Sequence, residues 1–221
     1  MLTSRTIPGG WKHESLAVSG HTFQLLLPAS PDDVFYHLEY HPEAAHELGH
    51  DPYWAQLWPT SITLAEWVLR ENWPAGQTAI ELGCGAGLVG LAAFKRGLQV
   101  TFSDYNPLAV ELALENARLN GFPQAKGLVL DWRTPPAQTY DVLLASDVIY
   151  DRQLHQPLLN TLSSLSHDRA RIYIGDGGRS ATEEFLQLAA DQWRMEIVDV
   201  DDQPKPDIHV SQYRRIGFFR K

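Results

Sequence analysis

The pattern of apolar and polar positions divides the chain near residue 77. From Thr78 onward, short apolar runs that end near a Gly or Asp alternate with amphipathic runs, which predicts strands alternating with helices. The predicted strands are 78–83, 98–104, 126–131, 140–147 and 169–176, and the predicted helices are 88–96, 107–120, 152–165 and 181–192. This alternation implies parallel pairing with right-handed crossovers.

The end of the chain breaks this rhythm. Residues 193–202 and 210–221 are two extended runs with no helix between them, which predicts a closing antiparallel pair at the edge of the sheet. The predicted fold class is therefore α/β: a Rossmann-like, doubly wound, seven-stranded and mostly parallel sheet with an antiparallel last strand. In such sheets ligands bind at the carboxyl ends of the strands.

The first part of the chain is less regular. Residues 16–28 predict a hairpin around Gly20, the segment Pro31–Pro52 is dense in Pro, His and acidic residues, and residues 60–72 predict a helix capped by Thr60 or Ser61. We therefore expect an N-terminal extension, residues 1–59, that packs on a cofactor-binding domain formed by residues 60–221.

Composition narrows the classes of partner. The formal charge of −9 disfavours non-specific binding to nucleic acid, and the longest uncharged run, Leu82–Phe94, is too short to cross a bilayer. The N-terminus lacks the apolar segment of a secretory signal, and the single cysteine, Cys84, allows no internal disulfide. We expect a cytoplasmic protein without nucleic-acid or membrane partners; the sequence does not indicate its oligomeric state.

The strongest motif is the glycine-rich run from Glu81 to Gly90. Glycines at 83, 85 and 87 allow a sharp turn from strand to helix and a close approach of the backbone to a ligand. From Gly85 the letters also spell G-x-G-x-x-G, and Asp104 follows 19 residues later. That spacing is the dinucleotide fingerprint too, so the loop alone leaves two cofactor classes open.

Three features favour S-adenosylmethionine over a dinucleotide. Glu81 precedes the loop with a spacing that resembles the class I methyltransferase motif, Gly83 is an additional glycine, and Asp131-Trp132 ends the third strand. The resemblance implies that Asp131 lies beside the adenine. Asp104 would accept hydrogen bonds from the two ribose hydroxyls. We interpret Cys84, inside the loop, as a small filler because nothing nearby would activate its thiol.

Further motifs resemble methyltransferase family 16, the seven-β-strand protein-lysine methyltransferases. They are the glycine loop, Leu-Asp-Trp at 130–132, Ser-Asp-Val-Ile-Tyr at 146–150 and Trp-Ala-Gln-Leu-Trp-Pro at 54–59, and the resemblance covers roughly residues 51–180. It implies catalytic roles for Asp147 and Tyr150, which would orient the acceptor amine. The expected cofactor-binding residues are Trp58, Glu81, Gly83, Gly85, Gly87, Asp104, Tyr105, Asp131, Trp132 and Ser146.

The predicted function is transfer of a methyl group from S-adenosylmethionine to nitrogen, with a protein lysine as acceptor. Two alternatives stay open at this point: a small-molecule N-methyltransferase, and a module that binds S-adenosylmethionine without catalysis. A dinucleotide oxidoreductase is disfavoured by Glu81, Asp131 and the antiparallel tail. The sequence names neither the acceptor nor the number of methyl groups added.

One motif points elsewhere. His46-Glu47-Leu48-Gly49-His50 matches H-E-x-x-H, the signature of zinc proteases. Pro52 would end any helix there, and Gln56 occupies the position of a third histidine ligand. We therefore expect no metal site, and the histidine-rich segment 37–50 has no predicted role.

Overall fold

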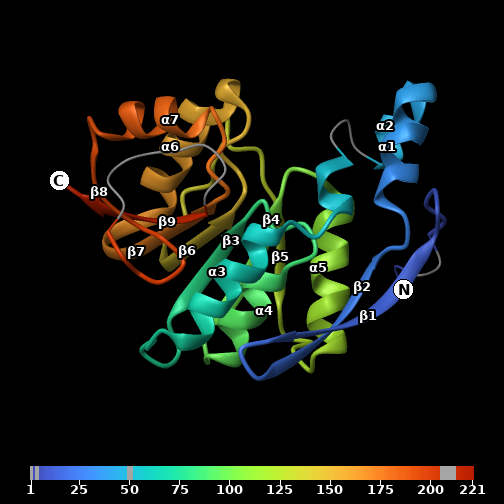
Figure 1. The fold of residues 1–221 in the computed structure, drawn as a ribbon, viewed down its shortest axis with the longest axis horizontal. Coiled ribbons are helices and arrows are strands. Elements are labelled where there is room, and N and C mark those ends of the chain that lie inside the picture. The colour runs from blue at the N-terminus through green and yellow to red at the C-terminus, as the bar shows by residue number, and fades with distance from the viewer. Residues whose placement is uncertain (1, 3–4, 49–51, 205–212) are drawn as a thin grey trace.

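The central element is a seven-stranded sheet with strand order β5-β4-β3-β6-β7-β9-β8 (Figure 1). The computed structural model describes residues 2, 5–48, 52–204 and 213–221, except for the side chains of residues 46 and 47. The strands are β3 (Thr78–Leu82), β4 (Gln99–Asp104), β5 (Lys126–Val129), β6 (Tyr140–Ser146), β7 (Ser166–Asp176), β8 (Trp193–Val198) and β9 (Arg214–Arg220). Only β9 runs antiparallel to its neighbours, so the predicted fold class is confirmed.

The closing pair has a more specific arrangement than the sequence predicted. β9 lies between β7 and β8, so β8 and not the last strand of the chain forms the edge of the sheet. β9 is also shorter than the predicted run 210–221; residues 210–212 of that run lie outside the described residues.

Helices cover both faces of the sheet, and each face has its own apolar core. On one face lie α3 (Pro59–Arg70), α4 (Leu88–Lys95) and α5 (Pro107–Leu119), with buried Leu64, Leu91 and Leu112. On the other lie α6 (His155–Leu165) and α7 (Thr182–Ala189), with buried Leu162 and Phe185. Burial of these side chains supplies the main driving force for folding. The predicted helices are thus confirmed, with ends shifted by a few residues.

A buried polar side chain of α5 holds the N-terminal hairpin against that helix. Strands β1 (Trp11–Val18) and β2 (His21–Pro28) join at Ser19-Gly20, where φ is +46° and +77°, the geometry of a tight two-residue turn. The fully buried Asn116 of α5 accepts a hydrogen bond from the Leu26 N–H (2.6 Å) and donates to the Leu26 carbonyl (3.2 Å). It also donates to the carbonyl of Ala86 in the glycine loop (2.9 Å). One amide therefore joins the hairpin, α5 and the loop.

The segment read from sequence as irregular contains a helix. α1 spans Pro31–Tyr40; the Ser30 side chain caps it by accepting from the Asp33 N–H (3.3 Å), and Pro31 occupies its first turn. Short turns of helix follow, namely η2 (Pro42–Ala44), α2 (Ala45–Leu48) and η3 (Pro52–Ala55). The Ser-Pro-Asp-Asp run is a recognisable start signal, and the many Pro and His residues after it obscured that signal.

No helix within the described parts of the chain combines the length and apolar character needed to cross a lipid bilayer.

Candidate active site

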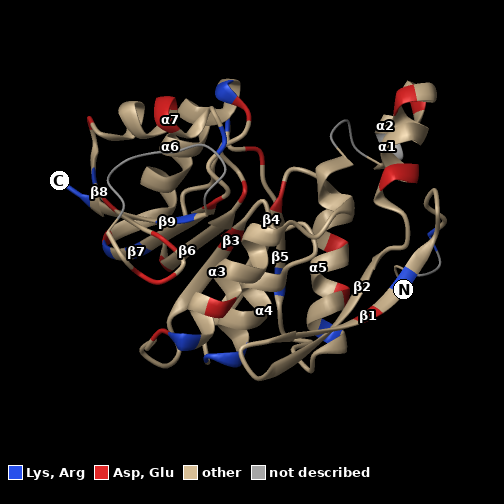
Figure 2. Cartoon of the chain, in the orientation of Figure 1, with Lys and Arg blue, Asp and Glu red and all other residues tan. Residues whose placement is uncertain are grey.

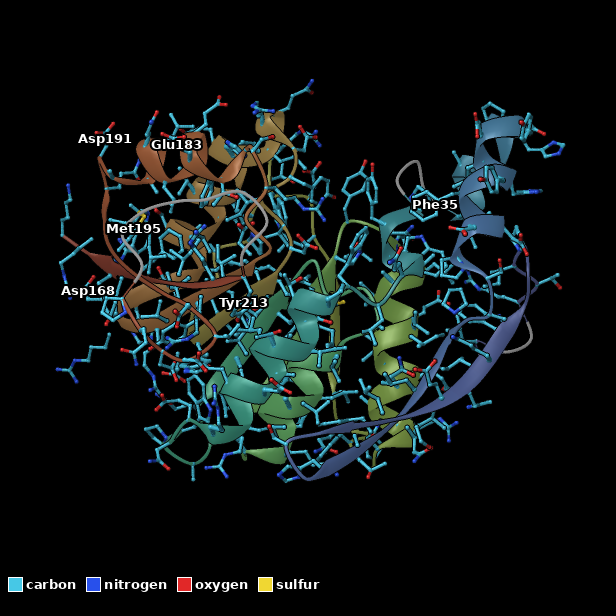
Figure 3. The ribbon with its side chains drawn as sticks, in the orientation of Figure 1. Phe35, Asp168, Glu183, Asp191, Met195 and Tyr213 are labelled. Carbon is cyan, nitrogen blue, oxygen red and sulfur yellow. The ribbon has the colours of Figure 1, made fainter. Side chains whose placement is uncertain are left out.

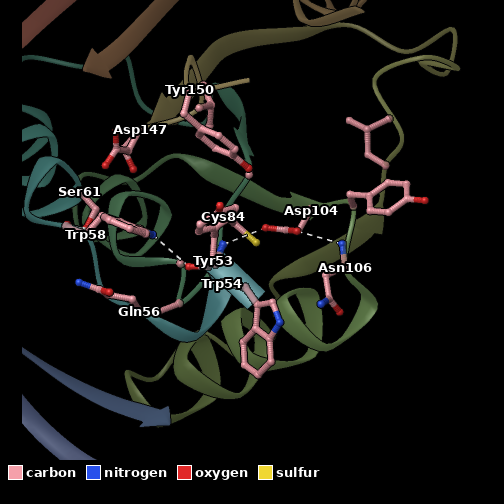
Figure 4. Close-up of a pocket in the computed structure, with 18 of the residues that line it drawn as sticks. Tyr53, Trp54, Gln56, Trp58, Ser61, Cys84, Asp104, Asn106, Asp147 and Tyr150 are labelled. Atoms are coloured by element: carbon pink, nitrogen blue, oxygen red, sulfur yellow. Dashed lines mark hydrogen bonds between the residues drawn. The ribbon is translucent and has the colours of Figure 1, made fainter. Parts of the chain in front are cut away.

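Strand order explains where the site lies. The carboxyl ends of β3, β4, β5 and β6 meet at one edge of the sheet, and a cavity of about 300 Å³ opens there (Figure 4). Segments 53–58, 83–88, 104–106, 130–133 and 146–151 supply most of its lining. Eleven of the twelve predicted site residues line this cavity: Trp58, Gly83, Gly85, Gly87, Asp104, Tyr105, Asp131, Trp132, Ser146, Asp147 and Tyr150.

The glycine loop needs its glycines for two physical reasons. Gly83, Gly85 and Gly87 have φ values of +63°, +48° and +79°, a region that side chains rarely adopt. A Cβ on Gly87 would also lie 2.9 Å from the Phe102 ring, where there is no room for it. The glycines thus let the loop bring its backbone against the cavity, where only the small side chains of Cys84 and Ala86 accompany it.

Glu81 is the predicted residue that lies outside the cavity lining. Its side chain is buried, and Oε2 accepts a hydrogen bond from the Gly90 N–H (2.8 Å) in the first turn of α4. Burial raises the pKa of Glu81 to about 8, although hydrogen bonds from the backbone partly oppose that shift. The geometry places Glu81 behind the loop, as a support that joins β3 to α4.

Asp104 lies at the end of β4 with its carboxylate at the cavity. Oδ2 accepts from the Gly85 N–H (3.1 Å) and Oδ1 from the Asn106 N–H (2.9 Å), which fixes the carboxylate relative to the loop. Burial raises the pKa of Asp104, against these two hydrogen bonds. The Asn106 side chain in turn caps α5 by accepting from the Leu108 N–H (2.9 Å).

Asp131 and Trp132 follow β5 and close the same side of the cavity. Asp131 Oδ1 accepts from the Arg133 N–H (2.9 Å), and the Trp132 carbonyl accepts from the Thr161 hydroxyl (3.0 Å). Both backbone bonds hold the segment against its surroundings while its side chains line the cavity. Of the three acidic residues at consecutive strand ends, Asp104 and Asp131 line the cavity, whereas Glu81 is buried behind the glycine loop.

The opposite side of the cavity carries Asp147 and Tyr150, away from Asp104 and Asn106 (Figure 4). Asp147 has φ of +58°, unusual for a residue with a side chain, and its N–H donates to the Gly175 carbonyl (2.8 Å). Its carboxylate accepts two hydrogen bonds from Arg179, from Nε to Oδ1 (2.8 Å) and from Nη2 to Oδ2 (3.0 Å). The Asp147 side chain is only 6% exposed.

Sequence reasoning did not predict Arg179 or Tyr53 as residues of the site. Arg179 comes from the turn between β7 and α7, and its guanidinium lies 5.3 Å from the centre of the Trp58 ring. Tyr53 of η3 lines the cavity with its ring centre 5.2 Å from that of Tyr150. The position of Arg179 just after a fifth strand end was an available signal, because all parallel strands end at the same edge.

Cys84 lines the cavity too, but burial raises the pKa of its thiol well above the ordinary value, so the thiol stays protonated. That agrees with its interpretation as a filler. The H-E-x-x-H motif falls largely outside the described residues: His46 and Glu47 lie in α2 without described side chains, and Gly49 and His50 are not described.

Comparison with known proteins connects this cavity to a family. A family model described as lysine methyltransferase matches residues 44–192, about two thirds of the chain, including every segment that lines the cavity. The chain belongs to the lysine methyltransferase family. It is accordingly an S-adenosylmethionine-dependent methyltransferase, and S-adenosylmethionine is its cofactor.

Individual relatives of this lysine methyltransferase agree on the class of reaction. The mouse protein "EEF1A lysine methyltransferase 3" is 28% identical over 74% of this chain and 74% of its own length. The human protein "Histone-arginine methyltransferase METTL23" is 27% identical over 70% of this chain and 88% of its own length. The crystal structure of a TehB-like S-adenosylmethionine-dependent methyltransferase from Corynebacterium glutamicum has a TM-score of 0.58 at 20% identity. It covers 84% of this chain and 99% of its own, and it shows the shared fold.

The cavity fits the cofactor chemically. The loop lacks side chains where a ligand would lie, because a Cβ on Gly83 would meet Val148 at 2.9 Å, and Asp104 presents a carboxylate beside it. A carboxylate suits ribose hydroxyls, and the N-terminal end of α4, with its positive dipole end, suits the cofactor's own carboxylate. The residue-by-residue assignment of these contacts stays a prediction.

Proposed function

We propose that this methyltransferase transfers the methyl group to the side-chain nitrogen of a lysine in a protein. One observation carries the proposal: a buried carboxylate, Asp147, and the rings of Tyr150, Tyr53 and Trp58 line the same cavity as the glycine loop. A carboxylate orients N–H groups, and aromatic faces stabilise the cation that forms as nitrogen is methylated.

The reaction sets one requirement on this wall. A lysine ammonium has no lone pair, so it must lose a proton before it attacks, and its ordinary pKa is about 10.4. Transfer into an apolar, aromatic pocket lowers that pKa because burial disfavours the charged form. Proximity and orientation then supply much of the acceleration, because the two reacting atoms are held together.

The distribution of charge favours a macromolecular acceptor over a small molecule. Residues 13–69 contain eight Asp and Glu side chains and no Lys or Arg, whereas the rest of the chain carries 19 acidic and 18 basic side chains. In Figure 2, α1 and α2 accordingly show acidic positions and no basic ones. This negative region attracts a basic segment of a protein, and it also borders the cavity through η3.

A contact path links the acidic region to the acceptor side. Phe35 projects from α1 (Figure 3), and its ring centre lies 5.7 Å from that of Tyr53, which in turn contacts Tyr150. Tyr36 and Tyr40 of α1 are 60% and 74% exposed. We therefore expect residues that flank the acceptor lysine to contact α1.

Incubation with methyl-labelled S-adenosylmethionine and a cell lysate tests the proposal. We expect label in a protein band and, after hydrolysis of that band, in methylated lysine. Label in methylarginine would replace lysine by arginine as the acceptor, and label in a small molecule would contradict a protein acceptor. The Asp104→Ala variant is the control, because loss of label there ties the signal to the cofactor site.

A further inference from the structure

Asp147 presents a difficulty for the proposed reaction. A carboxylate alone beside a lysine ammonium stabilises the charged form, whereas methyl transfer needs the neutral amine. The structure does not leave Asp147 alone: Arg179 forms two parallel hydrogen bonds with it, at 2.8 and 3.0 Å. Such a bidentate pair cancels the net charge and fixes the plane of the carboxylate.

The turn that carries Arg179 is itself held in place. Asp176, at the end of β7 and fully buried, accepts at Oδ1 from the Gly178 N–H (2.8 Å) and from the Thr182 hydroxyl (2.8 Å). Gly178 has φ of +73°, which a side chain would strain. Buried bonds on both sides of Arg179 thus fix where its side chain begins.

The pair does not serve the apolar core. The Arg179 side chain is 40% exposed and lies over Trp58 at the cavity wall, and Asp147 faces the cavity. The charged and titratable groups around the guanidinium are Asp147, Asp176 and Tyr150, and Tyr53 contacts Tyr150. Two carboxylates therefore face one guanidinium at the acceptor side.

We propose that Arg179 is a positioning residue: its bidentate bond aims the Asp147 carboxylate at the acceptor nitrogen and cancels its charge, so the nitrogen is held there in neutral form. The inference rests on the proposed nitrogen acceptor. A carboxylate offers about four lone-pair positions and Arg179 uses two, so oxygen lone pairs are left to accept the N–H groups of the amine.

The step balances without another reactant. The acceptor ammonium releases a proton to solvent, and its nitrogen lone pair then forms the N–C bond as the S–C bond breaks. The electron pair of that bond goes to sulfur. The methylated ammonium keeps its two remaining N–H groups, one of which Asp147 accepts. Arg179 stays charged throughout, because its hydrogen bonds to Asp147 hold its pKa above the ordinary value.

The decisive variant is Arg179→Gln, which removes the charge. N-acetyl-lysine methylamide serves as amine probe, and calorimetry measures its binding to protein saturated with S-adenosylhomocysteine. At pH 7, where the probe is cationic, we expect the variant to bind it about tenfold more tightly than wild type, because Asp147 is then an unpaired anion. On the labelled acceptor, the acidic limb of kcat, which reports the pKa of the bound amine, should move up by about one pH unit, with a lower rate below it.

Two further variants separate this role from a structural one. Arg179→Lys keeps the charge and loses the bidentate geometry, so the acidic limb should stay near wild type while kcat falls. Arg152→Gln is the matched control: Arg152 pairs with Glu184 at 2.7 Å in the neighbouring part of the fold, outside the cavity lining. Because this pair is exposed, its loss should lower the melting temperature less than Arg179→Gln does, and the pH profile should not change.

Each outcome decides the question. If Arg179→Gln leaves the pH profile and the binding of the probe unchanged, the Arg179–Asp147 pair only stabilises the structure. Faster turnover at every pH would make Arg179 a competitor for the acceptor site. Should wild type bind no probe and label no nitrogen, the acceptor assignment fails and Arg179 with it. Normal wild-type behaviour with an unchanged variant overturns the Arg179 role alone.

Discussion

Residues 13–69 and the rest of the chain contribute to the same cavity by different means. Beyond residue 77, a regular sheet supplies a glycine loop and acids at strand ends, and this part carries 18 acidic and 15 basic side chains. Residues 13–69 supply an aromatic wall from η3 and from Trp58, just before α3, and they carry eight acidic and no Lys or Arg side chains. The cofactor side depends on backbone geometry, whereas the acceptor side depends on surface chemistry and charge.

This difference can be tested, because substitutions in the two regions should affect different properties of the enzyme. Changes at the strand ends should alter cofactor binding, turnover or stability, and changes in residues 13–69 should alter the recognition of the acceptor. The effects should also differ in size, since one buried electrostatic contact outweighs several exposed charges.

The largest effect is expected for Asp147→Asn. The amide keeps the shape but leaves Arg179 as an unpaired cation beside the cationic transition state, and loss of one such electrostatic contact typically raises the barrier by about 2.7–4 kcal/mol. Affinity for S-adenosylhomocysteine, measured by calorimetry, should stay near wild type. The melting temperature should also fall, because Arg179 loses its ionic partner. Tyr150→Phe should reduce turnover less, because the ring remains. Full activity of the Asn variant with reduced stability would mean that Asp147 only ends a strand.

Glu81→Gln should change how stability depends on pH. Burial raises the pKa of Glu81 to about 8 in the folded state. Its protonated form is therefore favoured by folding, and its contribution to stability is lost as pH rises from about 4.5 to about 8, by up to roughly 1.4 kcal/mol per pH unit. Urea titrations at several pH values should show a smaller decline in the Gln variant. An equal decline in both proteins would contradict the assignment.

Asp104→Ala should weaken cofactor binding by about 1.5–3 kcal/mol, because the variant removes a charged acceptor from the ribose hydroxyls. It also frees the Gly85 N–H that Asp104 holds. Calorimetric titration with S-adenosylhomocysteine measures the loss. Unchanged affinity would show that the carboxylate braces the loop without contacting the ligand.

Reversing the charge of Glu39 and Glu43 together, each to Lys, should raise the KM for a protein acceptor about two- to fivefold per charge and leave kcat unchanged. The effect should shrink in high salt because exposed charges are screened. Glu183→Lys on α7, at the other end of the molecule from α1 (Figure 3), is the matched control. An equal effect of the control would show that only net charge matters.

The smallest effect is expected for the double replacement of His46 and His50 by Ala. The proposed reaction uses neither residue, so activity should be unchanged. Elemental analysis of the purified wild-type protein should find no stoichiometric zinc. One tightly held zinc per chain would restore the protease interpretation.

The same division explains what the sequence could predict. The loop could be predicted from the sequence because Gly83, Gly85 and Gly87 adopt positive φ values, which glycine takes readily and other residues rarely do. Asp104 and Asp131 could be predicted because they follow strand ends. Glu81 shares the spacing but faces away from the cavity, and spacing along the chain does not show which face of a strand end is used. Tyr53 reaches the cavity from a distant segment through tertiary packing, which no local pattern encodes. Arg179 follows a strand end, but its pairing with Asp147 also depends on tertiary packing.

The helix α1 was not predicted, although part of its signal is present in the sequence. Its start signal, Ser30-Pro31 followed by two acids, is local and was available, but the proline and histidine residues beyond it are equally typical of a loop. In the sheet, by contrast, repeated alternation of strand and helix made each element support the assignment of the next.

Asn116 has a consequence for how the molecule comes apart. Its single amide satisfies both backbone groups of Leu26 and the Ala86 carbonyl next to the cofactor loop. Separation of the hairpin from α5 would break the hydrogen bonds of this buried amide and destabilise the glycine loop at the same time. Local unfolding of the hairpin and of the loop should therefore be one cooperative transition. A ligand that orders the loop must then slow hydrogen exchange at the β2 amides. By the same linkage, deleting the hairpin should lower the affinity for the cofactor, although the hairpin does not contact the cofactor site.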